Sequence, residues 1–124
     1  MKNIKKHYKI KASPPDVYAA ITNPLSIEIW TGEKATMSTR AGEEFSLYSG
    51  DIMGRNLQFE TDRKIIQEWY FGDQEEPSIV TITLSPEKHF TNIELLHTNI
   101  PDEAFDDILH GWDESYFTPL KEFF

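Results

Sequence analysis

His97 is the residue whose type and position come closest to a chemical function. It shares the parity of Ile93 and Leu95 in the strand-like stretch 90–98, so the period of two places all three side chains on one face. A neutral imidazole that faces a cavity can donate a hydrogen bond to a ligand or act as a base. The competing interpretation is a core histidine satisfied by a neighbour, as buried polar groups usually are. We favour this second interpretation.

No other residues complete a catalytic constellation with His97. The remaining histidines, His7, His89 and His110, are scattered along the chain. The sequence contains no Gly-rich phosphate loop, no HExxH zinc motif and no nucleophile elbow. We therefore expect no catalytic residue, no metal site and no cofactor, and we predict that the protein is not an enzyme.

Charged side chains on the strand-like stretches are weaker candidates for a site. They are Asp51, Arg55, Glu60, Arg63 and Glu68. The simplest interpretation is a solvated sheet face with weak ion pairs. Arg55 could anchor a ligand if it faces inward. The loop 72–77, GDQEEP, could offer acidic contacts to a basic partner, although solvation alone explains its composition.

Large apolar and aromatic side chains are better candidates for a binding site. A curved sheet closed by a helix often leaves an apolar cavity where the two meet. We predict that the wall of this cavity contains Trp30, Phe45, Leu47, Trp69, Ile82, Leu95, His97, Phe105, Leu109 and Trp112. An ordinary core position is the alternative for each large aromatic residue. Both interpretations stay open for Trp112, because the terminal helix must close over any cavity.

The stretch 102–124 has to position much of this site. Apolar residues recur in it at spacings of three and four, which places them on one stripe of a long helix. They are Phe105, Ile108, Leu109, Trp112, Tyr116, Leu120 and Phe123. We expect Gly111 to permit a close approach to another backbone, and Pro119 to kink or end the helix near Ser115.

The rest of the chain predicts a sheet that receives this helix. Residues 3–11 alternate as a first strand, on an edge with lysines facing water, and Ser13 and Asn23 cap two short helices. About six antiparallel strands follow, with Gly54 a candidate bulge. The order predicts an α+β fold in which a curved antiparallel sheet wraps around the long C-terminal helix.

Composition limits the domain count and the partners. The chain has 124 residues, enough for the single domain that we predict over 1–124. Its net charge of −9 disfavours nucleic acid and anionic membranes as partners. It has no cysteine, so we expect no disulfide and a cytoplasmic location. No stretch is apolar enough for a membrane span. We also expect a monomer.

Several stretches, in order, resemble one known family. They are SPPDVYAAITNP at 13–24, GEEFSLYSGDIMGRNLQF at 42–59, KIIQEW at 64–69, VTITL at 80–84, HTNIP at 97–101 and GWDESYFTPLKEFF at 111–124. Together they are similar to the C-terminal domain of the activator of heat-shock protein 90 ATPase, in the START-like (helix-grip, SRPBCC) superfamily. The resemblance implies the helix-grip fold, with the two short helices after the first strand.

The resemblance also implies three kinds of function. The first is a non-enzymatic domain that binds a small hydrophobic ligand under the C-terminal helix. The second is a co-chaperone-like regulator that docks on a heat-shock protein 90 family chaperone, and the third is a START-like cyclase or hydrolase. The first strand begins at about residue 3, so we expect no counterpart of the eukaryotic activator's N-terminal domain. GDQEEP stands where the family often has a Trp-Pro-Gly-like loop.

Overall fold

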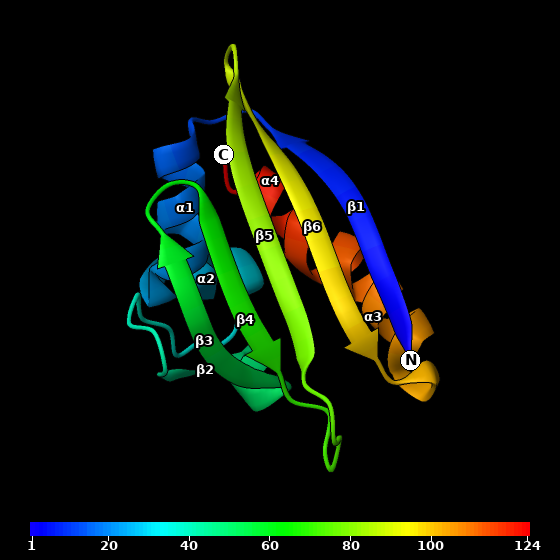
Figure 1. Cartoon of the computed structure of the whole chain (residues 1–124). Helices are drawn as coiled ribbons and strands as arrows, with labels where there is room; N and C mark the ends of the chain where they lie inside the picture. Colours follow the sequence, from blue (N-terminus) through cyan, green and yellow to red (C-terminus); the bar gives the residue numbers. More distant parts are fainter.

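The structure, a computed structural model of residues 1–124, is built around one six-stranded antiparallel sheet. The strand order is β1-β6-β5-β4-β3-β2, so β1 is an edge strand as predicted. The strands are β1 (Lys2–Ile10), β2 (Glu44–Leu47), β3 (Ile52–Glu60), β4 (Lys64–Trp69), β5 (Ser78–Glu87) and β6 (Phe90–Ile100). All the helices lie behind the curved sheet in the view of Figure 1. The α+β helix-grip fold is confirmed.

The two short helices begin at the caps that the sequence predicts. Helix α1 (Pro14–Thr22) follows Ser13, whose hydroxyl accepts a hydrogen bond from the Asp16 N–H. Helix α2 (Pro24–Thr31) follows Asn23, whose side chain accepts from the Leu25 N–H at 2.9 Å. Each cap satisfies a backbone donor that a helix leaves unpaired in its first turn. The two helices contact each other, and α1 packs against β5 and β6 of the sheet.

The C-terminal segment is not the single regular helix that the periodicity predicts. It consists of a 3₁₀ turn (Asp102–Ala104), α3 (Phe105–Gly111), a π-helical segment (Trp112–Phe117) and α4 (Thr118–Glu122). The π-helical segment widens the turn. As a result, Phe117 is buried together with Tyr116, and the predicted stripe misses it. Phe123, placed on that stripe, is 37 % exposed.

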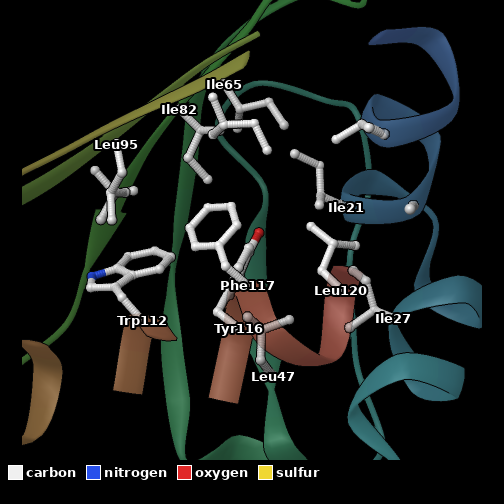
Figure 2. Packing of buried hydrophobic residues seen from close by; sticks show 14 of the residues in the cluster. Ile21, Ile27, Leu47, Ile65, Ile82, Leu95, Trp112, Tyr116, Phe117 and Leu120 are labelled. Carbon is white, nitrogen blue, oxygen red and sulfur yellow. The ribbon is translucent and has the colours of Figure 1, made fainter. Parts of the chain in front are cut away.

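The core lies between the sheet and this terminal segment. Trp112, Phe117 and Leu120 are at most 2 % exposed. In Figure 2 they project from the terminal segment toward the sheet and the two short helices. The sheet contributes Ile65, Ile82 and Leu95, and the short helices contribute Ile21 and Ile27.

Two glycines have roles opposite to those expected. A Cβ on Gly111 would meet nothing within 4 Å, so the prediction of a close backbone approach there is wrong. The close approach is at Gly54, where a Cβ would lie 2.0 Å from the Glu68 carbonyl oxygen. Gly54 is paired on both sides, and the register shift of β3 falls between Asn56 and Gln58 instead.

None of the helices has the length and the apolar character that crossing a membrane requires.

Candidate functional site

A pocket of about 250 Å³ opens between the terminal segment and the β2–β3 end of the sheet. Its lining combines aromatic, apolar and acidic side chains: Tyr48, Asp51, Ile52, Trp69, Asp107, Ile108, Gly111, Trp112, Ser115 and Tyr116. No histidine, cysteine, lysine or arginine is among them. This volume is just below the usual range of about 300–1,000 Å³ for ligand sites, so the pocket suits only a small molecule.

Two stacked tryptophans form the floor of the pocket. The ring centroids of Trp69 and Trp112 lie 4.8 Å apart with the ring planes at 29°. Tyr116 follows on the next turn, with its ring 4.9 Å from that of Trp112. Because all three side chains are at least nine-tenths buried, only narrow parts of their rings face the pocket.

A hydrogen-bond chain behind the floor holds Trp112. Its indole Nε1–H donates to His97 Nδ1 at 3.0 Å, and His97 Nε2 lies 2.8 Å from Ser78 Oγ. The indole can only donate, so Nδ1 accepts and the proton of neutral His97 resides on Nε2. Ser78 then donates to the Thr98 carbonyl oxygen at 3.0 Å. Every donor in the chain therefore has an acceptor, and the orientation of Trp112 is set.

The environment of His97 keeps its ring neutral. Burial lowers the pKa of His97 to about 4 from its ordinary 6.5. The side chains packed on the ring, Trp69, Phe71 and Trp112, carry no charge that could stabilise an imidazolium. Both ring nitrogens are engaged and the side chain does not line the pocket. These are the contacts of a satisfied core histidine.

A second chain holds Trp69 in the same manner. Its indole Nε1–H donates to Gln67 Oε1 at 3.1 Å, and Gln67 Nε2 donates to Asn56 Oδ1 at 3.0 Å. Asn56 Nδ2 then lies 3.3 Å from the Ser38 carbonyl oxygen. Gln67 and Asn56 are both buried. Two buried polar chains thus orient the two tryptophans of the floor.

One wall of the pocket is a strained turn between β2 and β3. Tyr48 and Ser49 have φ values of 53° and 56°, and Gly50 follows at 98°. The left-handed region is costly for residues with a Cβ, so other contacts must hold the turn. Tyr48 Oη–H donates to the Ser115 carbonyl oxygen. In a regular helix this carbonyl would accept from the N–H of residue 119, but Pro119 has no N–H. The Ser49 N–H donates to the Lys34 carbonyl oxygen at 2.9 Å.

The structure places two of the ten predicted wall residues at the pocket, Trp69 and Trp112. His97 lies directly behind them, and Phe105 and Leu109 are partly buried on α3. The others are buried in the core and do not line the pocket: Trp30, Phe45, Leu47, Ile82 and Leu95. Whether any of these residues binds a ligand stays a prediction.

Residues from the β2–β3 connection were not among the predicted wall residues. Tyr48, Asp51 and Ile52 line the pocket because the left-handed turn brings them against the terminal segment. The pair Gly50-Asp51 indicates a turn, but it does not indicate that the turn contacts the terminal segment. Arg55 is exposed and forms an ion pair with Glu68 at 3.2 Å, so it does not point into the pocket. The structure contains no cluster of three or more potential metal ligands.

Comparison with known proteins identifies the family. The model of the family described as "Activator of Hsp90 ATPase homolog 1-like protein" matches residues 11–124. The chain belongs to this family. The Dictyostelium discoideum activator of 90 kDa heat shock protein ATPase homolog is 32 % identical over 99 % of the chain, and human homolog 1 is 25 % identical over 90 %. The chain spans about a third of the length of these relatives, 33 % and 34 % respectively.

Solved structures of this activator-homolog fold superpose closely. An HSP90 activator from Plasmodium falciparum, PFC0360w, has a TM-score of 0.86 at 24 % identity, covering 95 % of this chain and 92 % of that one. CalU16 from Micromonospora echinospora has a TM-score of 0.83 at 26 % identity, covering 98 % of this chain and 74 % of that one. Proteins with different names thus share the fold, so the site has to carry the argument about function.

Proposed function

We propose that this activator-family domain binds a small apolar molecule in the pocket between its terminal segment and its sheet. The observation that carries the proposal is the floor of stacked Trp69 and Trp112, each held by its own buried hydrogen-bond chain. A buried hydrogen-bond network stabilises a structure only if each of its polar groups has a partner, as is the case for these two chains. Such a network holds the two indole rings in fixed orientations. A preformed surface lowers the entropy cost of binding.

The wall of the pocket supports the same proposal. Backbone strain concentrates at binding sites, and the consecutive left-handed residues Tyr48 and Ser49 stand at this one. We propose binding rather than catalysis, because the lining lacks histidine, cysteine, lysine and arginine. The cyclase or hydrolase alternative would have to use Asp51 or Asp107 as its base, because both ring nitrogens of His97 are engaged behind the floor.

Filling the pocket from within tests the proposal. Gly111 lines the pocket, has helical dihedral angles (φ −61°, ψ −35°), and a Cβ there meets nothing. We expect Gly111→Leu to fold and to abolish binding of 2-phenylethanol, a small neutral aromatic probe, in a calorimetric titration.

The matched control places the same side chain outside the pocket. Glu114 is exposed on the same segment and does not line the pocket, so Glu114→Leu should bind 2-phenylethanol as the wild type does. Equal binding by wild type and Gly111→Leu, or no binding by the wild type, would contradict the proposal.

A second candidate function is regulation of a heat-shock protein 90 family chaperone. It is favoured by the names of the relatives, which are activators of the ATPase of that chaperone. The chain corresponds to about a third of each relative. If the rest of each relative makes most of the contacts with the chaperone, this domain alone lacks the second linked binding site. It then loses an effective-concentration gain of about 10²-fold or more. We therefore expect weak stimulation or none in an ATPase assay, and strong stimulation at micromolar protein would refute that expectation.

A further inference from the structure

The charge of the pocket indicates which ligand it accepts. We propose that the ligand is a small organic ammonium ion, a positively charged amine on an apolar body. This inference rests on the proposed binding function, and it adds the sign of the charge. It follows from the aromatic walls, the unpaired carboxylates at the rim and an unpartnered hydroxyl in the lining.

Aromatic rings surround the pocket on several sides. Tyr48, Trp69, Trp112 and Tyr116 all contribute to the lining. The faces of such rings attract cations within about 6 Å of the ring centre, and tryptophan does so most strongly. Burial raises the pKa values of Tyr48 and Tyr116, so both phenols stay neutral at physiological pH. The four aromatic residues therefore line the pocket as neutral groups, and the carboxylates are the only charged groups in its lining.

Two carboxylates at the rim supply negative charge. Asp51 comes from the β2–β3 connection and Asp107 from α3, and both line the pocket. Each of the seven ion pairs of the protein uses another acid, so neither carboxylate is neutralised. No basic side chain lines the pocket to offset them. The two carboxylates repel an anionic ligand and attract an ammonium ion.

The hydroxyl of Tyr116 offers a further polar contact. The side chain is 6 % exposed and lines the pocket, yet its hydroxyl is paired with no group of the protein. Gln74 Oε1 is the only side-chain N or O atom that is both inaccessible to solvent and without a hydrogen-bond partner. The unpartnered Tyr116 hydroxyl therefore keeps some accessible surface. A phenolic oxygen can accept a hydrogen bond from an ammonium N–H. Because Tyr116 lines the pocket and its hydroxyl has no partner in the protein, we assign this hydroxyl as the acceptor for the ammonium N–H.

Three probes that share a phenyl ring separate charge from shape. They are 2-phenylethylamine, which is a cation at neutral pH, 2-phenylethanol, which is neutral, and phenylacetate, which is an anion. We expect the amine to bind at least about fivefold more tightly than the alcohol, and the acid not to bind measurably. Raising the ionic strength from about 0.01 to 0.15 M shortens the screening length from about 30 to 8 Å, which should weaken the amine more than the alcohol.

A pair of neighbouring aspartates provides matched variants. Asp106 and Asp107 are both exposed on the same turn of α3, but only Asp107 lines the pocket. We expect Asp107→Asn to weaken the amine about three- to tenfold and to leave the alcohol unchanged. Asp106→Asn should change neither affinity more than about twofold, because Asp106 does not line the pocket and solvent screens its charge over the longer distance. Tyr116→Phe should likewise weaken the amine more than the alcohol.

The outcomes distinguish this inference from the proposed function. Equal affinities for amine and alcohol would overturn the ammonium assignment and leave the binding function standing. Failure of all three probes would overturn both. A lysine side chain of a protein partner carries the same ammonium chemistry, so Nα-acetyl-lysine methylamide serves as a fourth probe. Tighter binding of 2-phenylethylamine would assign a free amine, and tighter binding of the lysine derivative a side chain.

Discussion

His97 should make the stability of the fold depend on pH in a defined window. Burial lowers the pKa of His97 to about 4, while the unfolded chain titrates at the ordinary 6.5. As the pH falls below 6.5, the unfolded state binds the proton first. The free energy of unfolding should therefore decrease from about pH 6.5 to about pH 4 and then level off, as far as this group is concerned. Above pH 6.5 both states are neutral and His97 contributes no pH dependence.

The magnitude follows from the separation of the two pKa values. Each pKa unit corresponds to about 1.4 kcal/mol, so His97 accounts for a loss of about 3 kcal/mol across this window. That is a large part of the roughly 5–15 kcal/mol that a domain has. The hydrogen bonds support the assignment, because protonation of Nδ1 would place a donor opposite the Trp112 indole N–H. Acidification should thus loosen the floor of the pocket as well.

Urea titrations of wild type and His97→Gln between pH 4 and pH 8 provide the assay. Other groups also titrate in this range, so the quantity to compare is the difference between the two proteins at each pH. Glutamine is neutral throughout and can both accept from an indole and donate to Ser78. We expect the stability advantage of the wild type to shrink by about 3 kcal/mol as the pH falls from 6.5 to 4. A constant difference at every pH would refute the neutral, buried assignment of His97.

Further predictions concern packing, and urea unfolding checks each. Gly54→Ala should destabilise by about 1–3 kcal/mol or more, because the added methyl group meets the Glu68 carbonyl oxygen at 2.0 Å. Gly111→Ala should stabilise by about 0.5–1 kcal/mol, since it raises helix propensity in open space, and an unchanged midpoint would argue against this geometry. Trp112→Ala should cost about 3–5 kcal/mol, whereas the exposed Glu114→Ala should stay within about 0.5 kcal/mol. Equal midpoints for this last pair would contradict the buried face of the terminal segment.

The fold could be predicted largely because its signals are local. Alternation in β1, β5 and β6 follows from the period of two, and the inward positions Ile4, Val80 and Leu95 are buried as expected. The caps Ser13 and Asn23 depend only on residues next to them in sequence. Such features do not require knowledge of the tertiary contacts.

The terminal segment and the pocket depend on contacts between distant residues. The π-helical segment brings Phe117 onto Tyr8 of β1, with ring centroids 4.0 Å apart, and no local pattern predicts this pairing. The helical period predicts the burial of Trp112 but not that of Phe117. The pocket wall likewise depends on the contact between Tyr48 and the Ser115 carbonyl. Gly54 and Gly111 look alike in the sequence, and only their neighbours distinguish a close approach from open space.

The indole N–H signals of the three tryptophans test the central claim most directly. Trp69 and Trp112 form the pocket floor, while Trp30 donates to the Ala20 carbonyl oxygen at 2.9 Å and does not line the pocket. A ¹H–¹⁵N titration with 2-phenylethylamine therefore contains its own control. We predict that the Trp69 and Trp112 signals shift together and saturate, while the Trp30 signal moves much less. Unchanged Trp69 and Trp112 signals at saturating amine, or equal shifts of all three, would contradict binding in this pocket.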